Sequence, residues 1–194
     1  MIEERAGLPI VAFADAAALE RWLAAQPDDS KGLWIKLAKA GSSRASVTQA
    51  EAIDAALCQG WIDGQLDKYD DEYWLIRFTP RKARSRWSKI NRARASQLIE
   101  TGRMRPGGLA QVEAARRDGR WDAAYAPASM AEVPADLQAA LNQHPEAAAF
   151  FATLSGANRY AILYRIEAAK RPETRARKIA QFVAMLERHE TVHG

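Results

Sequence analysis

The chain has 194 residues, of which 48% are hydrophobic and 27% are charged, and its formal net charge at pH 7 is +4. This composition is typical of a globular protein and excludes a disordered or fibrous chain, and the length allows one or two domains. The single cysteine, Cys58, excludes an intramolecular disulfide and a cysteine-based zinc cluster. Its apolar helical surroundings predict a buried structural thiol.

The amino-terminal residues predict neither secretion nor membrane insertion. Glu3 and Glu4 stand where a signal peptide would carry basic residues, and no apolar segment follows them. No apolar run approaches the roughly 20 residues that a membrane-spanning helix needs. We therefore expect a cytoplasmic protein without a membrane partner.

The chain begins with a predicted strand, helix and second strand. Residues 9–13 and 32–38 are apolar runs typical of short strands. Between them, Asp15 is expected to cap a helix, because an aspartate side chain can accept the free amides of the first helical turn. The polar cluster Pro27-Asp28-Asp29-Ser30 is expected to end that helix.

A second helix is predicted after a loop at residues 41–43. Thr48 and Glu51 have the spacing of a capping box, in which the threonine hydroxyl accepts the glutamate amide and the glutamate carboxylate bonds back. Gly60 is expected to lie just beyond the end of this helix, where a left-handed backbone favours glycine.

Residues 61–81 alternate between polar and apolar side chains, as a β-hairpin does. Two registers fit the turn: Tyr69 opposite Tyr73, or a two-residue turn at Asp70 and Asp71. A slip of one residue exchanges the two faces of a strand. We expect the first register, because it collects the apolar side chains of both strands on one face.

This register also predicts a polar face on the hairpin, with Asp63 opposite Thr79 and Gln65 opposite Arg77. The face turned away from the core would carry Asp63, Gln65, Asp67, Arg77 and Thr79, with Trp61 and Arg81 at its ends. After the hairpin, Ser85 or Ser88 is expected to cap a helix. Residues 106–108 are predicted to form a turn before a further helix.

The rest of the chain predicts helices. Residues 126–134 have the composition of a linker. Pro134, Pro145 and Pro172 each fit the first position of a helix. The fold class expected is α+β. A small antiparallel sheet packed by helices would occupy residues 1–128, and an all-helical module would occupy residues 129–194.

Several short motifs occur together along this chain. They are Gly60-Trp61-Ile62-Asp63-Gly64, Arg77-Phe78-Thr79-Pro80-Arg81, Ser85-Arg86-Trp87-Ser88-Lys89-Ile90-Asn91, Gly102-Arg103-Met104, Val133-Pro134-Ala135-Asp136-Leu137, Pro145-Glu146-Ala147 and Lys170-Arg171-Pro172-Glu173-Thr174-Arg175. With them the chain resembles the YdeI/OmpD-associated (OmdA, bacteriocin-protection) family of bacterial proteins over most of residues 30–188. The resemblance implies a largely uncharacterised protein and brings no reaction, catalytic residue or cofactor with it.

A basic segment, residues 77–94, contains eight lysines and arginines and no acid. It carries +8, and the rest of the chain therefore carries −4. Arginine matches the geometry of phosphate and carboxylate groups, and tryptophan offers a flat surface for stacking. We hypothesise a binding protein for a small anionic ligand, with a role in stress or bacteriocin tolerance. The candidate site residues are Trp61, Asp63, Arg77, Thr79, Arg81, Trp87, Ser88 and Asn91.

Two alternatives remain open from the sequence. The basic segment could instead follow the phosphate backbone of a nucleic acid, or Asp63 could act as the acid or base of an enzyme. The sequence leans against an enzyme, because it contains no nucleophile motif and no phosphate-binding loop. Acidic residues 63–72 match no calcium loop, so no metal site is expected, and no pattern identifies a cofactor or an oligomeric state.

Overall fold

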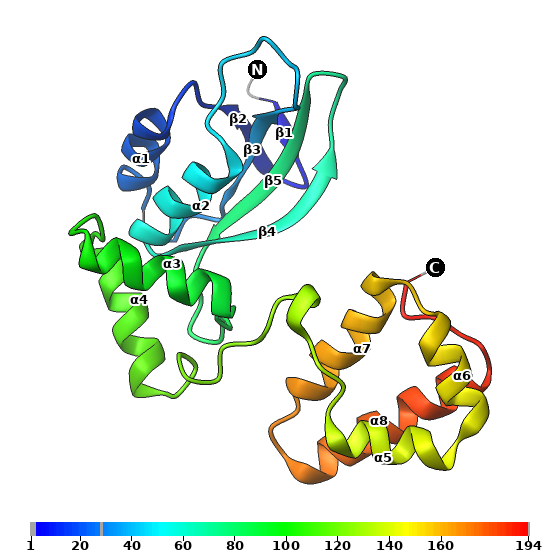
Figure 1. The fold of residues 1–194 in the computed structure, drawn as a ribbon. Coiled ribbons are helices and arrows are strands. Elements are labelled where there is room, and N and C mark those ends of the chain that lie inside the picture. The colour runs from blue at the N-terminus through cyan, green and yellow to red at the C-terminus, as the bar shows by residue number, and fades with distance from the viewer. Residues whose placement is uncertain (1–2, 28, 194) are drawn as a thin grey trace. The chain divides into compact units, whose positions relative to one another are not determined.

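The computed structural model describes residues 3–27 and 29–193 (Figure 1). Asp28, a member of the cluster expected to end the first helix, lies outside the described residues together with Met1, Ile2 and Gly194. The chain divides into two compact units, Met1–Ala124 and Tyr125–Gly194, called unit 1 and unit 2. The sequence placed this boundary after residue 128.

The described residues of unit 1 form a mixed five-stranded sheet. Its strands are β1 (Glu4–Arg5), β2 (Leu8–Ala12), β3 (Leu33–Ala38), β4 (Trp61–Lys68) and β5 (Tyr73–Pro80), in the order β1-β2-β3-β5-β4. The β2–β3 pair is parallel and the other pairs are antiparallel. The α+β class is confirmed, but the sheet is not wholly antiparallel, because a helix returns the chain from the end of β2 to the start of β3.

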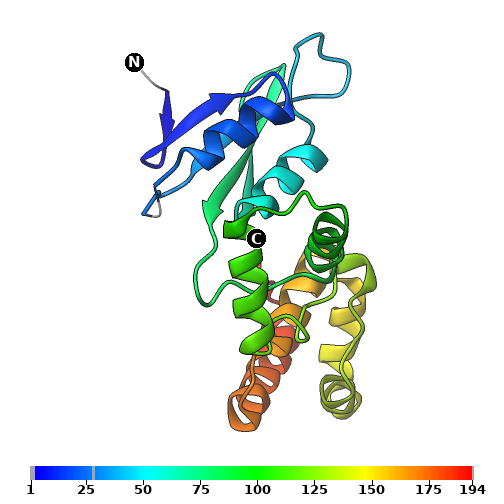
Figure 2. The ribbon, with the colours of Figure 1, turned by 90° about the vertical axis from the view of Figure 1, so that its left-hand side faces the viewer.

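Two helices cover one face of this sheet, as two views of the ribbon show (Figure 1, Figure 2). They are α1 (Ala16–Ala24), capped by Asp15, and α2 (Gln49–Cys58), which begins with the Thr48 and Glu51 capping box. Both caps are confirmed. Apolar side chains of the helices and strands form the main core of unit 1, including Leu19, Leu23, Ala55, Ile35, Ile76 and Phe78.

The hairpin of β4 and β5 keeps the predicted register only beside its turn. There Leu66 lies opposite Ile76, as expected. A β-bulge between Asp63 and Leu66 then shifts the pairing, so that Asp63 lies opposite Phe78 rather than Thr79. An extra residue in one strand exchanges its faces. The single polar face predicted for the whole hairpin is therefore wrong beyond the bulge.

Two further helices of unit 1 are α3 (Lys89–Glu100) and α4 (Pro106–Arg117). Ser88, and not Ser85, caps α3. The turn predicted at residues 106–108 is instead the first turn of α4, which begins with proline in a favoured position. A Cβ atom on Gly108 would stand 2.5 Å from the carbonyl oxygen of Cys58. Close approach of α4 to the end of α2 therefore explains this glycine.

The opposite face of the sheet carries a smaller apolar cluster, formed by Leu8, Ile10, Trp34 and Leu75. The amino-terminal strand is fixed to this part of the sheet by polar contacts. The indole of Trp34 donates to the carbonyl of Arg5 over 3.1 Å, and the guanidinium of Arg5 pairs with Asp67 over 2.6 Å. Arg77 lies opposite Trp34 in the β3–β5 pair and so shares this face.

Unit 2 is helical, as predicted. Its elements are the short 3-10 helix η1 (Ala128–Met130), α5 (Ala135–Gln143), α6 (Pro145–Thr153), α7 (Gly156–Glu167) and α8 (Pro172–Glu187). Pro145 and Pro172 open their helices, whereas Pro134 lies one position earlier as a cap. The core includes Leu137, Phe151, Ile162, Ile166 and Leu186. Within residues 3–27 and 29–193, no helix combines the length and apolarity needed to span a membrane.

Candidate anion-binding pocket

A polar pocket of about 540 Å³ lies in unit 1, where strand β5 ends. Its wall is built from the turn before β2, the loop before β3, and the end of β5 with the residues that follow. The polar side chains that line it are Asp29, Ser30, Lys31, Arg77, Thr79, Arg81 and Lys82. Three of the eight residues predicted from the sequence, Arg77, Thr79 and Arg81, are therefore brought together here.

Strand alternation and one glycine place these side chains around the pocket. Arg77 and Thr79 alternate with the buried Phe78, so they lie on the face opposite α1 and α2. The loop before β3 reaches this strand at Gly32, whose φ is 111° and whose Cβ, if present, would stand 2.4 Å from the carbonyl oxygen of Phe78. Only glycine permits this approach, which brings Lys31 beside β5.

The pocket has a positive electrostatic character. Among the described residues of the lining, Lys31, Arg77, Arg81 and Lys82 contribute four cations and Asp29 contributes one carboxylate, which gives these residues a formal charge of +3. The four cations come from two separate segments of the chain. Concave sites lined by one sign of charge concentrate counter-ions more strongly than a flat surface does, so the arrangement favours an anion.

Arg81 is held in one position by its surroundings. Only 6% of its surface is exposed, although it lines the pocket. Its guanidinium carbon lies 3.6 Å from the centroid of the Trp87 ring, and its Nη1 donates to the carbonyl of Arg86 over 3.2 Å. Its backbone amide donates to the carbonyl of Gly60. A guanidinium fixed in this way loses little further freedom when it binds a ligand.

Arg77 is the other arginine of the pocket. Its Nε atom is buried, and no described residue accepts a hydrogen bond from it. A buried donor without an acceptor is destabilising unless something else satisfies it. Arg77 therefore has hydrogen-bonding capacity that the described residues do not use.

The tryptophans predicted to stack against a ligand lie in the core instead. Trp61 is 5% exposed and packs edge-on against Trp22, and Trp87 is 1% exposed and packs against Trp121. Neither ring offers a flat surface to a ligand. The bulge in β4 explains Trp61, because it turns this residue to the core face. Trp87 instead supports Arg81 from behind.

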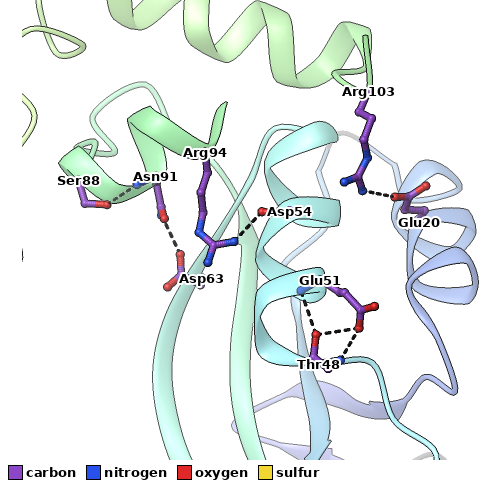
Figure 3. A network of polar contacts seen from close by, with 9 residues as sticks. All are labelled: Glu20, Thr48, Glu51, Asp54, Asp63, Ser88, Asn91, Arg94 and Arg103. Carbon is purple, nitrogen blue, oxygen red and sulfur yellow. Dashed lines mark hydrogen bonds and ion pairs between the residues drawn. The ribbon is translucent and has the colours of Figure 1, made fainter. Parts of the chain in front are cut away.

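Asp63, Ser88 and Asn91 form a separate group at the start of α3, and none of them lines the pocket. The Asn91 amide nitrogen donates to the Asp63 carboxylate over 3.0 Å, and the Ser88 hydroxyl accepts the Asn91 backbone amide; Figure 3 marks both contacts. The Asn91–Asp63 bond attaches the first turn of α3 to strand β4, and the Ser88 bond caps the helix. The group therefore has a structural explanation that the sequence did not indicate.

Much of the positive charge of the basic segment is used inside unit 1. Arg94 pairs with Asp54 of α2 over 2.8 Å, as Figure 3 shows, and Arg92 donates to the carbonyl of Trp121 over 3.1 Å. Arg81 is buried. The segment therefore does not present its eight cations on one exposed face.

Four polar residues of the pocket were missed by the sequence analysis, namely Asp29, Ser30, Lys31 and Lys82. Asp29 and Ser30 were interpreted as helix-ending polar residues, Lys31 was given no role, and Lys82 was counted only in the basic segment. Nothing in the sequence around residues 29–31 relates them to β5. The available signal was Gly32 directly before an apolar strand, a position where a glycine often marks close approach of another backbone. No group of three or more potential metal-ligating His, Cys, Asp or Glu side chains occurs among the described residues.

Comparison with known proteins gives two matches, one for each part of the chain. Residues 11–111 match the family described as "Domain of unknown function (DUF8412)", and residues 130–189 match the family described as "Bacteriocin-protection, YdeI or OmpD-Associated" (OmdA). No curated protein and no solved structure matches the chain. The chain therefore belongs to the DUF8412 family through its amino-terminal half, and its carboxyl-terminal part confirms the predicted relation to the OmdA family.

Proposed function

We propose that this protein binds a small phosphate- or carboxylate-bearing anion in the pocket at the end of β5. The observation that carries the proposal is the convergence of Lys31, Arg77, Arg81 and Lys82 on one pocket, where Asp29 supplies the only carboxylate among the described lining residues. Hydrogen bonds between arginine and an anionic oxygen are roughly twice as strong as neutral ones. The position of Arg81 against Trp87 reduces the conformational entropy lost on binding.

The nucleic-acid alternative has less support from the described residues. A protein that follows a phosphate backbone uses basic side chains spread along an exposed stripe. Arg81, Arg92 and Arg94 are instead engaged within unit 1. An enzyme that uses Asp63 also has less support, because Asn91 donates to this carboxylate and the residue does not line the pocket.

The direct test is calorimetric titration of the full chain with inorganic phosphate, citrate and a short single-stranded oligonucleotide. We expect Arg77→Met to weaken phosphate or citrate binding about tenfold or more, because one charge-assisted hydrogen bond contributes roughly 1.5–3 kcal/mol. Its free energy of unfolding should not fall, since the substitution removes a buried Nε that has no acceptor among the described residues.

Arg84→Met is the matched control, because Arg84 is exposed, belongs to the same basic segment and does not line the pocket. Equal losses in the two variants would contradict a site and would indicate a diffuse field. Binding of the oligonucleotide alone, with an affinity that falls steeply in salt, would favour the nucleic-acid alternative.

Two wider features complete the proposal. We place the protein in the cytoplasm, where a reducing environment suits its free buried Cys58, and cell fractionation tests this location. We also connect anion binding to stress tolerance, which the description of the OmdA family supports. A deletion strain should survive bacteriocin exposure less well, and a gene carrying Arg77→Met should restore survival less than the unchanged gene.

A further inference from the structure

We infer that the anion of this pocket is a phosphorylated polyol, such as a sugar phosphate, in which Lys31, Arg77, Arg81 and Lys82 bind the phosphate and Asp29 binds hydroxyl groups. The inference rests on the proposed function and narrows its ligand class. Three features of the pocket support it, namely its volume, the acid within it and a described lining without an aromatic ring.

The volume of the pocket exceeds what a free phosphate ion needs. At about 30 Å³ for each water, a pocket of about 540 Å³ has room for roughly 18 waters. It also lies inside the range of roughly 300–1,000 Å³ that is usual for small-molecule sites. A bound phosphate would leave most of this space to the rest of its molecule, so the ligand has a skeleton attached to the phosphate.

Asp29 indicates the chemistry of that skeleton. A carboxylate repels phosphate and other carboxylates, and its presence in a cationic pocket therefore disfavours a ligand that is anionic throughout. A carboxylate accepts hydrogen bonds from hydroxyl groups, and the hydroxyls of Ser30 and Thr79 can donate or accept. A skeleton with several hydroxyl groups satisfies all three side chains.

The apolar side chains of the pocket argue against a nucleotide. They are Ala6, Leu8 and Pro80, and no aromatic ring is found among the described residues that line the pocket. Binding sites for bases commonly stack them on aromatic side chains. The Trp87 ring, which packs against the Arg81 guanidinium, is buried and only 1% exposed. The pocket therefore lacks the surface that a base would use.

The test compares glucose 6-phosphate, ribose 5-phosphate, inorganic phosphate, AMP and glucose by calorimetric titration of the full chain. We expect at least one of the two sugar phosphates to bind about tenfold more tightly than inorganic phosphate and AMP, and glucose to bind without measurable heat, since hydrogen bonds to a charged group contribute roughly 1.5–3 kcal/mol.

Asp29→Ala tests binding of the hydroxyl groups separately from binding of the phosphate. It should weaken binding of the preferred sugar phosphate about tenfold and leave binding of inorganic phosphate unchanged or stronger. Asp29 is exposed, so the variant is expected to fold, and its unchanged melting temperature checks this. Asp118→Ala is a control that removes an acid of unit 1 outside the pocket.

The outcomes distinguish this inference from the proposed function. If inorganic phosphate or AMP binds as tightly as both sugar phosphates, or if Asp29→Ala weakens phosphate and sugar phosphate equally, the polyol inference is wrong and anion binding stands. If none of the phosphates binds but citrate does, the polyol inference is wrong and anion binding stands. If glucose binds as tightly as glucose 6-phosphate, or if neither the phosphates nor citrate binds, the proposed anion site is itself wrong and the inference falls with it.

Discussion

The two units place arginine in opposite situations. In unit 1, Arg77 and Arg81 line a polar pocket of about 540 Å³ that contains one carboxylate. In unit 2, a groove of about 510 Å³ lies between α5 and α8, and its floor is formed by apolar residues such as Ala140, Ile179 and Val183. Its arginine, Arg175, is bound by both carboxylate oxygens of Asp136, at 2.6 and 2.9 Å.

This difference shows why the number of basic residues does not locate an anion site. Arg175 also donates to the carbonyl of Ile166, so its donors serve the packing of α5, α7 and α8. In unit 1 the described residues that line the pocket include four cations and one acid, so an external anion can balance the excess positive charge. We therefore expect anion binding to depend on unit 1 and to be insensitive to Arg175.

The largest effect expected is that of Gly32→Ala, which should lower the free energy of unfolding of unit 1 by about 4 kcal/mol. The added Cβ meets the Phe78 carbonyl oxygen at 2.4 Å, and the backbone at φ 111° is strained for alanine. All six tryptophans lie in unit 1, so tryptophan fluorescence follows its unfolding alone, while circular dichroism also reports the helices of unit 2.

Gly119→Ala is the control for this substitution. Gly119 also has a positive φ, 77°, but a Cβ at this position has no atom within 4 Å. Gly119→Ala should lower the free energy of unfolding by about 1 kcal/mol, from backbone strain alone. Equal losses of stability in the two variants would mean that close packing of the Gly32 loop against β5 contributes nothing to the stability of unit 1.

A smaller loss, about 3 kcal/mol, is expected for Trp87→Leu, because a buried ring is removed from the core of unit 1. The variant should also bind inorganic phosphate more weakly, since Arg81 loses the ring that lies 3.6 Å away. Trp121→Leu removes the neighbouring ring of the same cluster, which is also buried, and should lower stability comparably without weakening phosphate binding. Equal binding losses would mean that the core as a whole, and not the Trp87 contact, supports Arg81.

The sequence predicted local structure better than the contacts between distant segments. Asp15 and Thr48 could be identified as caps, and Ser88 as one of two candidates, because capping depends on residues three positions apart. The bulge between Asp63 and Leu66 could not, since alternation is equally regular on either side of it. Arg77, Thr79 and Arg81 were predicted from the hairpin face and the basic segment, but Lys31 required knowledge of the approach at Gly32.

The smallest effect expected belongs to unit 2 and depends on pH. The Arg175 guanidinium holds the pKa of Asp136 below its ordinary value of 3.8 by hydrogen bonding. A carboxylate with a lowered pKa in the folded state stabilises the protein above its unfolded pKa, and this contribution is lost as the pH falls through the folded value.

Asp136→Asn should therefore destabilise unit 2 at pH 7 by about 1 kcal/mol or less, because the Asp136 side chain is 45% exposed and solvent screens the pair. The difference from the unchanged protein should shrink as the pH falls below about 4. Urea unfolding followed by circular dichroism at several pH values measures it, and tryptophan fluorescence should not change. A difference that persists at low pH would mean that the asparagine alters packing rather than the ion pair. A weaker affinity for inorganic phosphate in this variant would contradict the contrast between the two units, because the Asp136–Arg175 pair would then take part in anion binding.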